Sequence, residues 1–419
     1  MGLLRIGYCF GGSMKLLKRS ISIFILVAAL LSGVGCALRR NPVPLDNISS
    51  AKLAGIPGVR AWGDEYSDLF QNDLVESMRQ EGKGDFPLNA DGSTSYRALA
   101  LSGGGSNGAF GAGVLCGWTQ AGTRGKFKVV TGISTGSLIA PYAFLGSDYD
   151  HLLKESYTTI SDKNIYTSRN ILSLPWSESF KDTAPLKKLI AEQMDEDKLE
   201  EIAKLHAQGR RLYIGTTAMD AGRLMIWNMG AIASSGHPDA LELFRKVLLA
   251  SSSIPAAFPP VYFDVEVEGS KYDEMHSDGN TVTNVFFYGF MLDLPAARKE
   301  IYGNNAPPAG GDVYIIRDGK LEVRSEQVDR KLTKIAGRAL SIYSKAGAIG
   351  DLYRIYTITQ MNGIGFNYID IPTDYKPISE KPFDQAEMNQ LFNLGFEMGK
   401  SGKDWQNVPL GLDKIKTVK

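Results

Sequence analysis

Gly132-Ile133-Ser134-Thr135-Gly136 places a serine between two glycines in the pattern G-x-S-x-G. This pattern is typical of a nucleophile elbow, a tight turn between a strand and a helix that exposes the serine hydroxyl. Residues 126–130 predict a short strand before it, and residues 137–145 predict the start of a helix after it, despite Pro141. The two glycines leave room for a turn that larger side chains would block. We therefore predict that Ser134 is a catalytic nucleophile.

A second glycine cluster lies upstream, in Ser102-Gly103-Gly104-Gly105-Ser106-Asn107-Gly108. It follows a run at 97–101 that predicts a buried strand, and it precedes a run at 109–120 that predicts a helix. Consecutive backbone N–H groups and the positive end of the following helix suit a developing oxyanion. We predict an oxyanion hole at Gly103, Gly104, Gly105 and Ser106, with Gly108 supporting the motif.

The same cluster also matches G-x-G-x-x-G, the dinucleotide-binding fingerprint. That fingerprint needs an acidic residue about 20 positions further on to hold the ribose. No Asp or Glu occurs between Asp91 and Asp148. We therefore reject a dinucleotide site and predict no cofactor. The small, apolar character of this stretch indicates the buried centre of a parallel α/β sheet.

A serine nucleophile needs a group that accepts its proton. Asp278 is the first candidate, because residues 272–276 predict a strand that delivers it to a turn at Gly279. The alternative is His276 in a Ser–His–Asp triad, since all four histidines follow Ser134 in the chain. The acids that such a triad would use are Asp220 and Asp273. The residues alone leave both possibilities open.

In combination and in order, these motifs resemble those of the patatin-like phospholipases, over residues 96–290. Segments 182–186 and 250–260 also resemble family segments. The resemblance implies acyl-ester hydrolysis by a Ser134–Asp278 dyad, a glycine-rich oxyanion loop and a three-layer α/β/α core. Two positions depart from the family pattern. Asn107 stands where Arg or Lys is usual, and Asn280 stands where Gly or Ala is usual.

The N-terminus predicts a secretory signal, with either Met1 or Met14 as the start. Three basic residues between positions 15 and 19 precede an apolar run at 21–31, and small residues lead from there to Cys36. The apolar run is shorter than the about 20 residues of a spanning helix. We expect a bacterial lipoprotein signal with lipidation at Cys36. Ala37 is not the aspartate of an inner-membrane retention signal, which favours the outer membrane of the cell envelope. A secreted or signal-anchored protein is the alternative.

Composition excludes several other classes of protein. The 46 basic and 46 acidic residues leave no basic excess for nucleic-acid binding. A hydrophobic content of 43% is that of a folded globular protein. Cys9 and Cys36 lie in the leader region and only Cys116 lies inside the mature domain, so no disulfide within that domain is possible. No Cys/His spacing predicts zinc and no Asp-rich loop predicts calcium, so we expect no metal site.

The expected fold is α/β, with a three-layer α/β/α patatin-like core around a mostly parallel sheet. The expected sections are a signal peptide at 1–36, a tether and N-terminal segment at 37–95, the acyl hydrolase domain at 96–320 and a C-terminal helical extension at 321–419. Within the extension, a helix over 328–361 is expected to be broken by its glycines. The apolar segment 171–180 suits either a flap beside the pocket or core packing, and we favour core packing.

We therefore predict a membrane-tethered serine acyl hydrolase of phospholipase A, lysophospholipase or esterase type. Its substrate would be a membrane lipid or another acyl ester. Two alternatives stay open: an α/β-hydrolase-like esterase with a Ser–His–Asp triad, and a catalytically silent lipoprotein that binds lipid.

Overall fold

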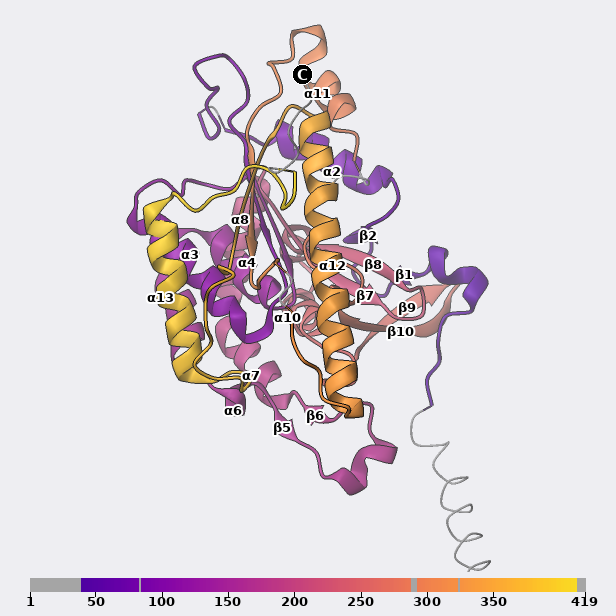
Figure 1. Cartoon of the computed structure of the whole chain (residues 1–419). Coiled ribbons are helices and arrows are strands. Elements are labelled where there is room, and N and C mark those ends of the chain that lie inside the picture. The colour runs from indigo at the N-terminus through magenta and orange to yellow at the C-terminus, as the bar shows by residue number, and fades with distance from the viewer. Residues whose placement is uncertain (1–38, 83, 288–291, 323–324, 413–419) are drawn as a thin grey trace, which may run out of the picture.

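The computed structural model describes residues 39–82, 84–287, 292–322 and 325–412. Its centre is one twisted sheet, flanked by helices on both faces (Figure 1). The strands of this sheet are β1 (Lys52–Leu53), β2 (Arg60–Trp62), β3 (Arg97–Leu101), β4 (Val129–Ile133), β7 (Arg211–Ala218), β8 (Arg223–Asn228), β9 (Val261–Val267), β10 (Ser270–Asp278), β11 (Asp312–Arg317) and β12 (Gly365–Asp370).

The main strand order is β1-β9-β10-β7-β4-β3-β11-β12, while β8 pairs with both β7 and β2. Strands β7, β4, β3, β11 and β12 run parallel, and the remaining pairs are antiparallel. Because parallel strands end at the same edge of a sheet, the segments after β3, β4 and β11 lie together. The predicted mostly parallel sheet is confirmed.

The described helices are α2 (Asp68–Arg79), α3 (Gly108–Gln120), α4 (Thr135–Leu145), α5 (Asp150–Thr158), α6 (Asp162–Ile165), α7 (Ala184–Gln193), α8 (Glu196–Ala207), α9 (Met229–Ala233), α10 (Ala240–Ser251), α11 (Leu294–Tyr302), α12 (Leu332–Met361) and α13 (Gln385–Ser401). Strand residues alternate between the two faces of the sheet. Leu99 and Leu101 pack with the side chains of α3, α4, α10 and α13, and Ala98 and Ala100 pack with those of α2 and α12. This arrangement is the predicted three-layer α/β/α core.

Helices α3 and α13 lie in very close contact along one face (Figure 1). A Cβ on Gly113 or Gly117 of α3 would lie 2.1 or 1.9 Å from a carbonyl oxygen of α13. A Cβ on Gly395 or Gly399 of α13 would lie 2.1 or 2.2 Å from a carbonyl oxygen of α3. Glycine is therefore required on both helices, and the C-terminal helix is part of the core rather than an appendage.

Several sequence-based boundaries need correction. The strand expected at 126–130 is observed at 129–133, directly before the elbow. Helix α12 runs without a break from Leu332 to Met361. A glycine inside a helix lowers its stability by only about 1 kcal/mol and does not by itself end it. The 321–419 section holds helices as expected, but it also contributes β12, which pairs with β11. The 37–95 section likewise adds β1 and β2 to the sheet.

The segment from 171 to 180 is also different from our expectation of core packing. It spans η5 (Ile171–Trp176), between the short paired strands β5 (Thr167–Ser168) and β6 (Lys181–Asp182). The side chains of Leu172, Trp176 and Phe180 are exposed, so the segment protrudes from the core. The prediction of core packing was wrong because an apolar run has the same composition whether or not the fold covers it.

Candidate active site

The elbow forms where β4 ends and α4 begins, with Ser134 between them. Its backbone has φ 53° and ψ −125°, a conformation that costs energy for a residue with a side chain. A Cβ on Gly132 would lie 2.5 Å from the Gly136 carbonyl oxygen, and a Cβ on Gly136 would lie 2.5 Å from that of Leu101. Both glycines are therefore required for the turn, as the motif predicted.

Asp278 lies beside this serine. The Ser134 hydroxyl donates a hydrogen bond of 2.6 Å to Asp278 Oδ2. Register explains the meeting: β4 pairs Ile133 with Gly215 of β7, and β10 pairs Asp278 with the next residue, Thr216. The two side chains are only 5% and 2% exposed, so the contact is largely shielded from water.

The Asp278 carboxylate is held on its other side by the backbone. Asn280 N–H donates to Asp278 Oδ1 at 2.8 Å, which orients Oδ2 toward the serine. Burial raises the pKa of Asp278 from its usual range to about 7, although the hydrogen bonds from Ser134 and Asn280 oppose that shift. A carboxyl group with a pKa near 7 can gain and lose a proton at neutral pH, as a general base must.

Asn280 takes the place where the family pattern usually has a smaller residue. It is absent from the positive-φ residues, so the turn after Asp278 does not require glycine there. A Cβ on Gly103 would lie 3.4 Å from the Asn280 side chain, so this side chain borders the oxyanion loop. Gly279 beside it has no room for a side chain, since its Cβ would lie 2.7 Å from the Gly215 carbonyl oxygen.

The glycine-rich loop after β3 lies against the serine. A Cβ on Gly103 would lie 3.2 Å from Ser134 Cβ. The Gly103 N–H already donates to the Asn284 carbonyl at 3.0 Å, which narrows the predicted set of oxyanion donors. The N–H groups of Gly104, Gly105 and Ser106 donate no hydrogen bond to another described residue. Gly108 is confined by Thr135, whose Oγ1 would lie 2.2 Å from an added Cβ.

Two buried charged residues that sequence reasoning missed support this loop from the end of β11. Arg317 Nη1 donates to Ser102 Oγ at 3.1 Å and to the Gly103 carbonyl at 2.5 Å. Asp318 accepts from the Gly111 N–H at 2.9 Å, which ties it to the first turns of α3. Burial raises the pKa of Asp318 well above its usual range. An Arg-Asp pair at the end of the apolar run Val313-Tyr314-Ile315-Ile316 was the available signal.

A third residue that the sequence did not indicate, Ser251, holds the elbow itself. Ser251, the last residue of α10, accepts a hydrogen bond from the Ser134 N–H at 3.0 Å and donates to the Gly215 carbonyl at 2.7 Å. The backbone N–H of Ser134 is therefore already bound. It is therefore not a free oxyanion donor, and the glycine-rich loop stays the predicted source of such donors.

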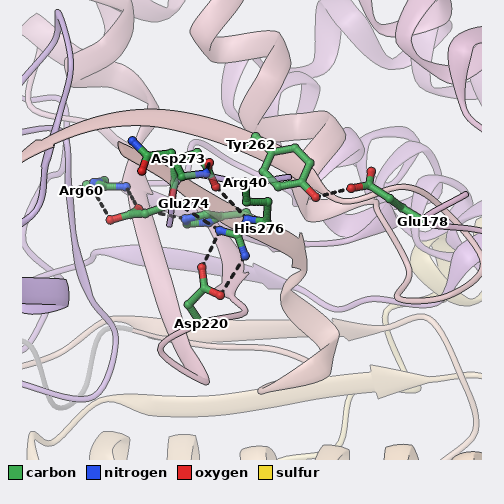
Figure 2. Close-up of polar contacts among 9 residues, drawn as sticks. Arg40, Arg60, Glu178, Asp220, Tyr262, Asp273, Glu274 and His276 are labelled. Carbon is green, nitrogen blue, oxygen red and sulfur yellow. Dashed lines mark hydrogen bonds and ion pairs between the residues drawn. The ribbon is translucent and has the colours of Figure 1, made fainter. Parts of the chain in front are cut away.

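His276, the alternative base, has partners other than Ser134. Its Nδ1 lies 2.9 Å from Thr216 Oγ1, and its Nε2 lies 3.2 Å from Glu274 Oε2. Burial lowers the pKa of His276. Figure 2 shows the ring within a polar cluster in which Glu274 pairs with Arg60.

The acids that a triad would use belong to the same cluster. Asp220 and Asp273 both bind Arg40, at 2.7 and 2.8 Å (Figure 2). This arrangement fastens the first described residues to β10 and to the turn between β7 and β8. Both acids bind Arg40, whereas the His276 nitrogens contact Thr216 and Glu274, so the geometry gives a triad with these acids no support.

Within the described ranges, no group of three or more His, Cys, Asp or Glu side chains could hold a metal ion. No helix in this part of the chain is long and apolar enough to cross a membrane. Cys36 and the whole predicted signal peptide lie outside the described residues.

Comparisons with known proteins bear on the same region. The sequence model of a family described as patatin-like phospholipase matches residues 99–291. Curated protein sequences contain no match to this chain. Among solved structures, VipD from Legionella pneumophila is 12% identical, with a TM-score of 0.37, over 77% of this chain and 70% of that one. The type III effector protein ExoU is 12% identical, with a TM-score of 0.28, over 83% of this chain and 60% of that one.

Proposed function

Because residues 99–291 form a patatin-like phospholipase domain, a domain of lipid hydrolases, we propose that this protein hydrolyses acyl esters of lipids with Ser134 as nucleophile and Asp278 as base. The observation that carries the proposal is the 2.6 Å hydrogen bond between the two side chains at a strained elbow. A hydroxyl that already donates to a carboxylate can lose its proton as it attacks a carbonyl carbon.

The proposed reaction proceeds through an acyl-enzyme. Ser134 Oγ attacks the ester carbonyl carbon while its proton passes to Asp278 Oδ2. The carbonyl oxygen becomes an oxyanion, which the N–H groups of Gly104 and Gly105 stabilise. Such donors contribute about 10²–10³ in rate each. Collapse of this intermediate breaks the ester bond, and Asp278 returns the proton to the departing alcohol.

Deacylation repeats these steps with water. Asp278 removes a proton from water, and the resulting hydroxide attacks the acyl carbon bound to Ser134. The fatty acid leaves and Ser134 regains its proton from Asp278. One carboxyl group therefore serves as base and acid in turn, which suits a pKa of about 7.

The proposed substrates are acyl esters of membrane lipids, of the phospholipase A, lysophospholipase or esterase type. We further propose that lipidation at Cys36 tethers the enzyme to the bacterial outer membrane, beside such lipids. The composition of the leader supports this tether: basic residues, an apolar run and small residues lead to one cysteine.

The nucleophile is tested with Ser134→Ala and a fluorophosphonate probe, which labels activated serines. The wild-type chain should take up the probe and hydrolyse lipid esters. The variant should do neither, while its circular dichroism and melting temperature show that it is folded. Labelling of the folded variant at another serine, with hydrolysis retained, would refute the assignment.

A further inference from the structure

The N-terminal half of α12 is unlike the other long helices. From Ala348 onward the helix buries a regular set of side chains against the sheet. Between residues 332 and 347 it buries none. In Figure 1 this half extends to the lower end of the molecule, away from the layer that the other half covers.

The exposed half is amphipathic. Most of its apolar residues recur at intervals of three and four, which places them on one face of the helix, while Leu340 lies at the border of that face. We call this face the α12 stripe, and it consists of Leu332, Ile335, Ala336, Ala339, Ile342, Tyr343 and Ala346. Leu332 is 84% exposed and Tyr343 is 74% exposed, so the described chain leaves the stripe uncovered. A contiguous exposed apolar face on a helix normally marks an interaction surface.

The face next to this stripe is basic. Lys334, Arg338 and Lys345 lie there, and Arg330 and Lys331 precede the helix. No acidic residue occurs between positions 330 and 350, in a chain whose total formal charge is zero. The nearest acidic partner is Glu326, which pairs with Arg338 from outside the helix. An apolar stripe beneath a basic face is the composition of helices that lie in the surface of an anionic bilayer.

A second apolar protrusion points to the same end of the molecule. The segment between β5 and β6 reaches the lower end in Figure 1, as the start of α12 does. It exposes Leu172, Trp176 and Phe180, and Leu172 is 75% exposed. Tryptophan and other aromatic side chains are favoured at the boundary between lipid and water.

Hydrogen bonds connect the elements that carry both protrusions to the candidate active site. Phe180 N–H donates to the Ala256 carbonyl, and the nearby Ser253 carbonyl accepts from Asp278 N–H at 2.8 Å. On the other side, Asp351 of α12 accepts from the Asn284 N–H at 2.7 Å, and the Asn284 carbonyl accepts from Gly103. The segments that carry both protrusions therefore contact the segments that hold Asp278 and the glycine-rich loop.

We propose that the α12 stripe, with Leu172, Trp176 and Phe180, docks on the surface of an anionic lipid bilayer. The stripe enters the boundary between headgroups and acyl chains, and the basic residues beside it contact the anionic headgroups. The proposal deepens the proposed function by naming the surface from which substrate is taken, but binding itself does not depend on hydrolysis.

Binding is tested with a local fluorescent reporter, so that attachment through the leader cannot mask the result. In the full chain, Cys9, Cys36 and Cys116 are replaced by Ser, and one cysteine is introduced by Tyr343→Cys and labelled with an environment-sensitive dye. Ser341→Cys, on the other face and also exposed, is the matched control. With phosphatidylglycerol vesicles, the dye at position 343 should shift to the blue, and the dye at 341 should shift much less. Vesicles of phosphatidylcholine alone, or added salt, should weaken the shift.

Two results would overturn the docking surface. Equal responses at 341 and 343 would show that the stripe does not face the lipid. A blue shift at 343 before vesicles are added would show that protein covers the stripe, either a second copy or another part of this chain.

Activity supplies an independent test with charge-matched variants. Ile335→Glu with Tyr343→Glu alters the stripe, and Thr333→Glu with Ser341→Glu adds the same charge outside it. The ratio of vesicle turnover to water-soluble ester turnover should fall at least about tenfold in the first pair, and less than about twofold in the second. Equal falls would overturn the docking surface. A wild-type chain that binds vesicles but hydrolyses neither substrate would instead refute the proposed function.

Discussion

At the residue scale, the contact between Ser134 and Asp278 combines two unfavourable features. The serine has a strained backbone conformation, and the carboxyl group is almost fully buried. Each feature costs folding free energy, and each makes the pair more reactive. The strained turn places the hydroxyl against the carboxylate, and burial raises the pKa of the carboxyl toward neutrality. Such costs are typical of sites selected for chemistry.

The pH dependence of hydrolysis follows from the Asp278 pKa of about 7. The base must be ionised, so kcat/KM should rise as pH increases toward 7 and then level off. A pH profile measured on a soluble ester between pH 5 and 9 checks this. A profile that stays flat through pH 7 would contradict the role of this carboxyl group.

Replacing the base should affect activity and stability in opposite directions. Asp278→Asn keeps the size of the side chain but removes its basicity, so activity should fall by about 10² or more. His276→Ala should cost much less activity per folded molecule, because its nitrogens bind Thr216 and Glu274. The reverse order would favour a histidine triad.

The stability effect of Asp278→Asn has a definite sign. The folded pKa of about 7 lies above the unfolded value, so the wild-type protein loses stability as pH rises from about 4 to 7. The variant has no such loss. Its melting temperature should exceed that of the wild type at pH 8, and the difference should shrink toward pH 4.

At the element scale, the oxyanion loop depends on what packs behind it. A Cβ on Gly104 would lie 2.3 Å from the Asp318 carbonyl oxygen, which belongs to a rigid, buried segment. Gly104→Ala should therefore displace the loop. We expect a loss of kcat of about 10² or more, comparable to the loss of one oxyanion donor.

Gly350→Ala is the matched control for that substitution. An added Cβ at Gly350 meets nothing within 4 Å, and the residue lies in helical backbone. Kinetics of both variants on one soluble ester, with melting temperatures to show folding, separate a loop effect from a general one. Equal activities in the two variants would mean that the loop tolerates the shift.

At the scale of the whole molecule, the N-terminal segment and the C-terminal section both join the central sheet, through β1, β2 and β12. Arg40 fastens the first described residues to Asp220 and Asp273. The segment that follows the predicted leader is therefore held on the central sheet. A lipid anchor at Cys36 would leave only a few residues between the membrane and this edge of the sheet.

The proposed anchor predicts a specific outcome for Cys36→Ser. The variant should escape lipidation and accumulate as an uncleaved precursor, because the cysteine is both the acceptor and the cleavage point. Mass spectrometry of the native protein should find a lipid-modified Cys36. An unmodified Cys36 in the mature chain would favour a signal anchor or plain secretion.

Local patterns in the sequence were enough for the elbow, the glycine-rich loop, Asp278 and the α/β class. Each depends on short-range constraints, such as glycine at a turn without space, or strand periodicity. The strand at 97–101 was predicted with its observed bounds for the same reason. The order of these motifs also predicted the family match.

Only the tertiary structure decided which groups meet and which remain exposed. Arg317 and Asp318 lie behind the oxyanion loop because β11 pairs with β3, a contact between residues more than 200 positions apart. His276 does not bind the serine, because its nitrogens contact Thr216 on β7 and Glu274 on its own strand. The apolar residues of α12 have helical periodicity whether or not something covers them, so their exposure could not be read from spacing. Pairing between distant strands and the burial of one face depend on the whole fold, and local sequence does not encode them.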